Sequence, residues 1–208
     1  IVEKILERQG TGGNDHRIAP SVAYHAADLE KRQYDPDKAK FYAKKAGGIN
    51  VKLSAADAAF AGAVDAATLY KEHAAAAGIE IEVVREPNDG YWSNVCIPKP
   101  RGTCYWGGRP SQDLMFTTAY QGGGSWNDTF WAHTRFDELL ISARAETDSE
   151  KRRAMYFEMQ QIVRDEGGVV VPMFANNVWA ASDKVAHGSL AQNWTMDGNK
   201  FMENWWFA

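Results

Sequence analysis

Residues 34–86 alternate between helical and strand patterns, and this alternation constrains the fold more than any other feature of the chain. In "YDPDKAKFYAKKAGG", Asp35 fits a helix N-cap, Pro36 fits the first helical position and Gly47 ends the helix behind two lysines. "INVKLS" and "IEIEVVRE" alternate as strands do, and an alanine-rich helix is expected between them from about residue 57 to residue 77. Helices and strands in this order predict a βαβ unit and therefore an α/β fold.

Two further helices are expected in the second half of the chain. "RFDELLISARAE" predicts a short helix, and residues 148–166 predict a long one. Thr147 and Glu150 fit a capping box at the start of the long helix. Its apolar stripe consists of Met155, Met159, Ile162 and Val163.

The other elements are expected to be short. Residues 1–9 are expected to be the end of a helix that stops at Gly10, and residues 11–20 a loop. Short strands are expected at "VCIP" and "TCYWG", in residues 169–182 with a break at Pro172, and in an extended C-terminal segment. No repeat or linker separates these elements, so we expect a single α/β domain over residues 1–208.

Cys96 and Cys104 flank the turn "IPKPRGT". Two strands joined by this turn would bring the sulfur atoms within bonding distance, and an oxidising compartment would then favour a disulfide. Two buried free thiols are the other interpretation, and the sequence leaves both open.

The composition excludes several classes of partner and chemistry. The 208 residues carry a net charge of −4 without a long basic run, so we expect neither nucleic acid nor an anionic membrane as a partner. The five histidines are scattered, and neither a phosphate-binding loop nor a nucleophile elbow is present. We therefore expect no metal, cofactor or catalytic residue. The chain begins with Ile rather than Met, and we expect it to be a piece of a longer protein.

The stretch "CYWGGRPSQDLMFTTAYQGGGSWNDTFW", residues 104–131, is the candidate binding site. Glycines let a backbone approach a ligand closely, and aromatic side chains supply apolar walls. Each aromatic side chain alone fits a core position, but a cluster on a predicted loop favours a site. The aromatic members are Tyr105, Trp106, Tyr120 and Trp126.

Carboxylates near these tryptophans allow an enzymatic alternative. A secreted hydrolase of saccharides or peptides would need two carboxyl groups about 5–10 Å apart, and Asp113 and Asp128 are the candidates. Otherwise, Asp128 and Asp137 cap turns or helix starts. Two convergent, partly buried carboxyl groups would favour hydrolysis, whereas an open aromatic wall would favour half of a binding cleft.

Several motifs in order resemble one family over nearly the whole chain. They are "YDPDKAKFYAKKAG", the tryptophan strand with its Gly/Pro/Asp loop, "FD-x-L-L", "R-x-x-x-Y-x-x-x-Q", "P-x-F" and the terminal "DGNKFMENWWFA". The chain resembles the extracytoplasmic solute-binding proteins of ABC importers, of the oligopeptide/dipeptide/nickel-binding class (solute-binding family 5).

The resemblance implies one lobe of a type II periplasmic-binding-protein fold, an α/β fold in which helices flank a mixed sheet. Residues 1–208 would form only the C-terminal lobe, with residues 1–20 and 198–208 near the hinge or the missing N-terminal lobe. Such a protein is no enzyme: it captures a peptide or similar small solute between two lobes and delivers it to the membrane permease. The resemblance also implies a monomer in the periplasm or elsewhere outside the cytoplasm.

The residues expected to contact the ligand are Tyr105, Trp106, Gly108, Arg109, Asp113, Tyr120, Trp126 and Asn127. The charge of one position departs from the family. In peptide-binding members, an aspartate three residues after the tryptophan pairs with the amino terminus of the ligand, whereas here Arg109 stands three residues after Trp106. A guanidinium attracts carboxylate or phosphate, so Arg109 would bind an anionic group of the ligand or pair with an acid nearby such as Asp113.

Overall fold

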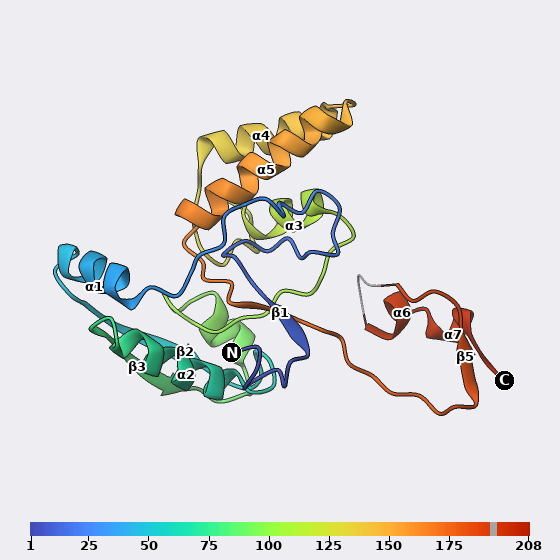
Figure 1. Ribbon diagram of the computed structural model, residues 1–208, viewed down its shortest axis with the longest axis horizontal. Coiled ribbons are helices and arrows are strands. Elements are labelled where there is room, and N and C mark those ends of the chain that lie inside the picture. Colours follow the sequence, from blue (N-terminus) through green and yellow to red (C-terminus); the bar gives the residue numbers. More distant parts are fainter. Residues whose placement is uncertain (192–194) are drawn as a thin grey trace. The chain divides into compact units, whose positions relative to one another are not determined.

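The computed structural model describes residues 1–191 and 195–208 as two compact units (Figure 1). The first unit consists of residues 31–106 with Ile1 and residues 3–7, and the second consists of residues 8–30 and 107–208 with Val2. That both units belong to a single lobe stays a prediction. Within the described ranges, no helix is long and apolar enough to cross a membrane.

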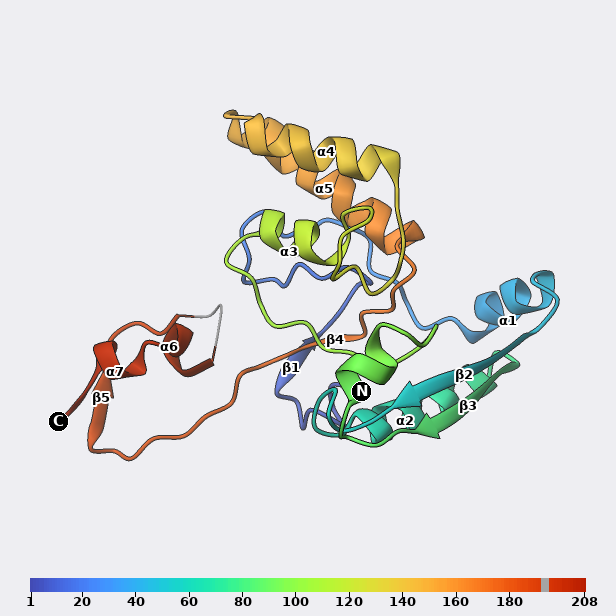
Figure 2. The ribbon, with the colours of Figure 1, turned by 180° about the vertical axis from the view of Figure 1, so that it is seen from behind.

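The first unit is built on the predicted βαβ motif. Its elements are α1 (Pro36–Lys45), β2 (Ile49–Ala55), α2 (Ala63–Ala75) and β3 (Ile79–Arg85). β2 and β3 pair in parallel from Ile49–Ile79 to Ala55–Arg85, and α2 packs against them (Figure 2). The Asp35 side chain accepts a hydrogen bond of 2.8 Å from the Lys38 amide, which confirms the predicted N-cap.

The segment after β3 differs from the prediction. The two strands expected around the cysteines are absent from the described structure, where Trp92–Cys96 form a π-helical turn, η1. Gly102 makes only an isolated parallel bridge with Ser54. Cys96 and Cys104 form a disulfide, which decides between the two interpretations that the sequence left open. A turn, rather than two paired strands, brings the two sulfur atoms together.

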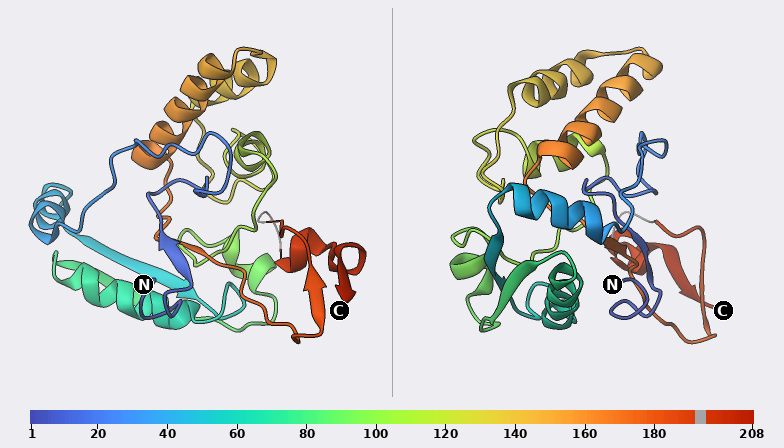
Figure 3. Two further views of the ribbon diagram at one scale, coloured as in Figure 1. Left: turned by 45° about the vertical axis from the view of Figure 1, so that its right-hand side comes forward. Right: turned by 60° about the vertical axis from the view of Figure 1, so that its left-hand side comes forward.

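The second unit combines three helices with two antiparallel strand pairs. The helices are α3 (Gln112–Ala119), α4 (Thr134–Ala145) and α5 (Ser149–Glu166), and α4 and α5 lie side by side (Figure 3). β1 (Gly10–Gly12) pairs with β4 (Met173–Ala175), and β5 (Val185–His187) pairs with β6 (Trp205–Phe207). Two short helical segments, α6 (Thr195–Asn199) and α7 (Phe201–Asn204), precede β6. We expected one mixed sheet with both parallel and antiparallel pairing. In the described residues, the one parallel pair and the two antiparallel pairs instead form three separate two-stranded sheets.

Helix α5 supplies the core of the second unit. Its N-cap is Asp148, whose Oδ1 accepts hydrogen bonds of 3.0 Å from the amides of Glu150 and Lys151, and not Thr147 as predicted. The buried face is also rotated from the predicted stripe, because Met155 and Ile162 are half-buried. The fully covered positions of α5 are Tyr156, Met159, Gln160 and Val163.

Two buried glutamines fix residues 23–26 against the helices. The Gln160 amide accepts a hydrogen bond of 2.9 Å from the Ala26 amide and donates one of 2.9 Å to the Tyr24 carbonyl. Gln112, at the start of α3, donates one of 2.7 Å to the Ala23 carbonyl. The bond to Ala26 satisfies a buried backbone amide, and the other two hold partly buried carbonyls against the helices.

Three further predictions are wrong. Residues 1–9 form turns rather than a helix, with Glu7 and Arg8 at positive φ. The stretch 104–131, predicted as one loop, contains α3, whose N-cap Ser111 accepts a hydrogen bond of 3.2 Å from the Leu114 amide. The C-terminal segment, predicted to be extended, is helical before β6 begins.

The buried face of α5 can be tested with Met159→Asp. Met159 is 0% exposed, so the substitution places an unpaired carboxylate in the core and should lower the free energy of unfolding by several kcal/mol, about 3 or more. Ala154→Asp, on the exposed face of the same helix, should cost less than about 1 kcal/mol. Urea unfolding followed by circular dichroism measures both, and equal costs would contradict this orientation of α5.

A second prediction concerns His16, which is 1% exposed and makes no hydrogen bond through its ring nitrogens. Burial, then the nearby charges of His25 and Arg164, lower the pKa of His16 from 6.5 to about 4. The unfolded chain therefore binds this proton more readily, and the stability is complete above pH 6.5 and is lost as the pH falls toward 4. The loss should reach about 3 kcal/mol.

Urea unfolding measured from pH 7 to pH 4 tests the His16 prediction. His16→Gln removes the buried imidazole and should flatten the pH dependence across this window. His73→Gln, at an exposed position of α2, should leave it unchanged. An imidazole signal of His16 that titrates near pH 6.5 in the folded protein would refute the prediction.

Candidate functional site

The predicted contact residues divide between the two units. Tyr105 and Trp106 belong to the first unit, and the other six belong to the second. We therefore describe one aromatic surface in each unit.

The aromatic ladder of the first unit consists of Tyr91, Trp92 and Tyr105. Tyr91 is 1% exposed, Trp92 is 42% exposed and Tyr105 is 58% exposed, so the three rings lead from the core to the surface. Successive rings meet edge to face, with centroids 5.8 Å and 5.2 Å apart. Trp106 follows Tyr105 and is half-buried. Such rings offer flat apolar area that a ligand can cover.

Hydrogen bonds and the disulfide hold the aromatic ladder at the carboxyl ends of β2 and β3. The buried Tyr91 hydroxyl donates to the Thr103 carbonyl at 2.7 Å, and Cys104 is bonded to Cys96. Beside them, the Glu86 carboxylate accepts hydrogen bonds from Lys99 and, at 2.7 Å, from Ser54. The bonds from Lys99 and Ser54 lower the pKa of Glu86, which keeps this carboxylate charged.

The aromatic loop of the second unit, residues 120–131, is organised by Asn127. Its buried side-chain amide donates to the carbonyls of Tyr120, Gln121 and Trp131 at 3.3, 3.2 and 2.7 Å. Its side-chain oxygen accepts from the amide and hydroxyl of Thr129. This closed loop presents Trp126, 64% exposed, and Phe130, 74% exposed, to the surroundings.

Gly122 packs closely against Asp137 where the aromatic loop begins. The Gly122 amide donates to Asp137 Oδ1 at 3.1 Å, and a Cβ at Gly122 would lie 2.7 Å from Asp137 Oδ2. Asp137, in the first turn of α4, thus holds the start of the aromatic loop through a contact between residues far apart in sequence.

Tyr120, the first residue of the aromatic loop, is a core residue. It is 0% exposed, and burial raises the pKa of its hydroxyl. The Arg17 guanidinium lies 5.0 Å from its ring centroid and donates to Asp128 at 3.1 Å. With side chains only 10% and 9% exposed, Arg17 and Asp128 form a nearly buried ion pair.

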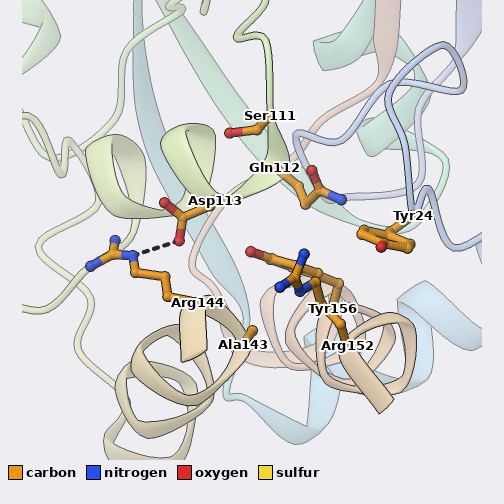
Figure 4. Close-up of a pocket in the computed structure, with 8 residues that line it drawn as sticks. All are labelled: Tyr24, Ser111, Gln112, Asp113, Ala143, Arg144, Arg152 and Tyr156. Carbon is orange, nitrogen blue, oxygen red and sulfur yellow. Dashed lines mark hydrogen bonds and ion pairs between the residues drawn. The ribbon is translucent and has the colours of Figure 1, made fainter. Parts of the chain in front are cut away.

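Asp113 and Arg109, which the sequence offered as partners of each other, have other contacts. Asp113 accepts a hydrogen bond of 2.8 Å from Arg144 Nε on α4 (Figure 4). Arg109 is half-buried and donates to the Gly107 carbonyl at 2.8 Å and to the Gly108 carbonyl at 3.3 Å. Gly108 itself is exposed.

The structure changes which residues are useful candidates. Tyr120 and Asn127 are buried and stabilise the aromatic loop from its inner side, whereas Tyr105 and Trp126 are exposed. Sequence reasoning missed Trp92 and Phe130. Both residues stand near glycine, Asn or Asp in the sequence. Aromatic residues in such surroundings were the reason for selecting residues 104–131, and the same criterion applied to "DGYWSN" would have found Trp92.

Comparison with known proteins places this fold among substrate-binding proteins. The ABC transporter-associated periplasmic binding protein DppA from Helicobacter pylori, in complex with the peptide STSA, matches 99% of this chain with a TM-score of 0.75 and 16% identity. The oligopeptide-binding protein AppA from Bacillus subtilis, in complex with a nonapeptide, matches 100% with a TM-score of 0.72 and 16% identity. NikZ from Campylobacter jejuni, in complex with Ni(L-His), matches 80% with a TM-score of 0.68 and 16% identity.

Sequence comparison is more limited. No family model matches the chain. The dipeptide-binding protein DppE of Bacillus subtilis is 28% identical over 72 residues, which are 35% of this chain and 13% of DppE. The chain also spans only 41% of the DppA structure and 44% of the AppA structure. The predicted α/β class and the predicted likeness to peptide- and nickel-binding proteins are confirmed, and the fold is that of part of such a substrate-binding protein.

The buried ion pair of Arg17 and Asp128 yields a prediction that separates structural from catalytic roles. Asp128→Asn removes the negative charge from a nearly buried ion pair and should lower the free energy of unfolding by about 3–5 kcal/mol. The double variant Arg17→Met/Asp128→Leu removes both charges and should recover most of this loss. Urea unfolding of the single and double variants measures the coupling. A folded, fully stable Asp128→Asn protein that has lost a hydrolytic activity would support the enzymatic alternative instead.

Proposed function

We propose that the chain is part of the substrate-binding component of an ABC uptake transporter and captures a peptide or similar small solute. The observation that carries this proposal is the match of 99% of the chain, with a TM-score of 0.75, to a binding protein in complex with a peptide. The chain covers 41% of that protein, so a further lobe would complete the binding site.

The two aromatic surfaces support capture by burial between lobes. The aromatic ladder and the aromatic loop expose rings that are held from behind by buried hydrogen bonds. Rigid aromatic walls contribute apolar area at a low cost in side-chain entropy, and a second lobe would cover the other side of the ligand. Binding energy then favours the closed form of the protein, which is the form presented to the permease.

The partners and location proposed here follow from this function. The chain would work as a monomer with the missing N-terminal lobe and the permease subunits, in the periplasm or elsewhere outside the cytoplasm. The Cys96–Cys104 disulfide agrees with an oxidising compartment.

A hydrolytic function is not favoured by the carboxylates that suggested it. Asp113 is paired with Arg144, and Asp128 is paired with Arg17. Each of the two carboxylates thus has a structural partner from another part of the chain, which accounts for its presence without catalysis. We therefore propose binding without catalysis.

Arg109 is proposed to recognise an anionic group of the ligand. It is half-buried beside two glycines whose carbonyls accept its hydrogen bonds, and it stands three residues after Trp106. In the protein that contains both lobes, Arg109→Ala should weaken binding about ten- to a hundredfold, because a charge-assisted hydrogen bond is lost. Arg109→Asp should weaken it further by adding repulsion.

The experiment begins with native mass spectrometry of the two-lobed protein from its source, which identifies the co-purified solute. Isothermal titration of that solute then compares wild type, Arg109→Ala and Trp126→Ala with the control Arg101→Ala, an exposed arginine of the first unit. The absence of any co-purified or titratable solute would contradict the transport function. Equal affinities of wild type and Arg109→Ala would contradict only the role of Arg109.

A further inference from the structure

The second unit contains a pocket that the proposed function does not use. It has a volume of about 290 Å³ and lies among the N-terminus of α3, the end of α4 and the first turns of α5, with Tyr24 at one side (Figure 4). None of the exposed aromatic side chains of the aromatic loop lines it. The volume is at the lower end of the range for ligand pockets and suits a molecule of a few heavy atoms.

The pocket carries a net positive charge. Two guanidinium groups, Arg144 and Arg152, line it against the single carboxylate of Asp113. That carboxylate already accepts a hydrogen bond of 2.8 Å from Arg144, whose terminal nitrogen also donates to the Thr117 hydroxyl. The uncompensated charge is therefore that of Arg152, and it matches a ligand with one negative charge.

One buried donor in this pocket has no acceptor within the described residues, and a tyrosine hydroxyl lies near it. Arg152 donates through Nη2 to the Glu146 carbonyl, but its buried Nε has no partner. Tyr156 is 4% exposed, and its ring reaches from α5 toward Asp113 with the hydroxyl on the pocket side (Figure 4). Burial, followed by the charge of Asp113, raises the pKa of Tyr156 to about 12, so the hydroxyl remains a proton donor at neutral pH. A buried donor such as Arg152 Nε is normally paired, and an anionic acceptor in the pocket could also accept from the Tyr156 hydroxyl.

Most of the remaining wall is apolar. The rings of Tyr24 and Tyr156 are stacked with centroids 5.7 Å apart, and the Ala143 methyl group lies among the lining atoms. Such a wall suits the carbon portion of an organic acid and has nothing to offer inorganic phosphate, which also carries more charge than one arginine neutralises.

We propose that this pocket binds a small monocarboxylate, with its carboxylate held by Arg152 and the Tyr156 hydroxyl and its carbon portion against the tyrosine rings. The arginine fork matches the geometry of a carboxylate, and the hydroxyl supplies a further donor. Ser111 lies at the same pocket, and its hydroxyl, which accepts from the Leu114 amide, keeps a proton to donate. This proposal does not depend on solute capture by the aromatic surfaces, because it uses none of their residues.

Benzoate is the probe, and benzamide is the neutral molecule of the same shape. Titration of the whole chain at constant ionic strength, followed by amide NMR shifts, should show saturable binding of benzoate with shifts at Ser111, Gln112 and Ala143. Benzamide should bind at least tenfold more weakly, since it cannot complete a charged pair. Inorganic phosphate should bind more weakly than benzoate.

Variants identify the two donors. Tyr156→Phe keeps the ring and removes only the hydroxyl, so it should weaken benzoate binding about five- to tenfold, and Arg152→Met should weaken it tenfold or more. Arg135→Met is the matched control, because Arg135 lies on α4 outside the pocket, where it pairs with Glu158. It should change the affinity less than twofold.

Four outcomes would overturn the proposal. They are the absence of saturable benzoate binding, equal affinities for benzoate and benzamide, tighter binding of phosphate than of benzoate, and equal losses in Arg152→Met and Arg135→Met. If Arg152→Met does not fold, Tyr156→Phe decides alone. The native solute identified for the two-lobed protein should bind Tyr156→Phe as it binds wild type, so failure of the pocket and failure of solute capture are distinguishable.

Discussion

The second unit depends on the contact between two buried glutamines and residues 23–26. Gln160 on α5 bonds both the Ala26 amide and the Tyr24 carbonyl, and Gln112 on α3 bonds the Ala23 carbonyl. These bonds join parts of the chain that are far apart in sequence, and without the bond to Gln160 the buried Ala26 amide would lack a partner. The contact also places Tyr24 beside Tyr156, and so forms one wall of the pocket.

The R-x-x-x-Y-x-x-x-Q motif of α5 contains one residue that holds the fold together and two that line the pocket. Arg152, Tyr156 and Gln160 follow one another at intervals of four residues and therefore lie on one face of the helix. Gln160 anchors the chain, while Arg152 and Tyr156 line the pocket. The aromatic surfaces likewise combine a holding residue with an exposed one. The hydrogen bonds of Tyr91 and Asn127 hold the backbone in place, and the rings of Tyr105 and Trp126 remain exposed.

Local signals predicted those elements whose sequence and packing agree. The helix capped by Asp35, the two parallel strands, α4 and the bulk of α5 follow from capping residues and hydrophobic period. The helix expected at residues 1–9 is absent, and Glu7 and Arg8 adopt positive φ values that a right-handed helix excludes. The strands expected around the cysteines are replaced by a turn because the disulfide and the Tyr91 hydroxyl bind the chain there. α3 was missed although Ser111 offered an N-cap, since glycine-rich surroundings suggested a loop.

The sequence by itself determined the α/β class and the likeness to solute-binding proteins, because periodicity, caps and motif order are local properties of the chain. Only the tertiary structure decided which aromatic side chains are exposed and which charges are paired. Tyr120 and Trp126 look alike in sequence, yet one is 0% and the other 64% exposed. Asp113 stands near Arg109 in sequence but pairs with Arg144 from another helix. Burial and ion pairing depend on residues far away along the chain, and only the folded arrangement brings those residues together.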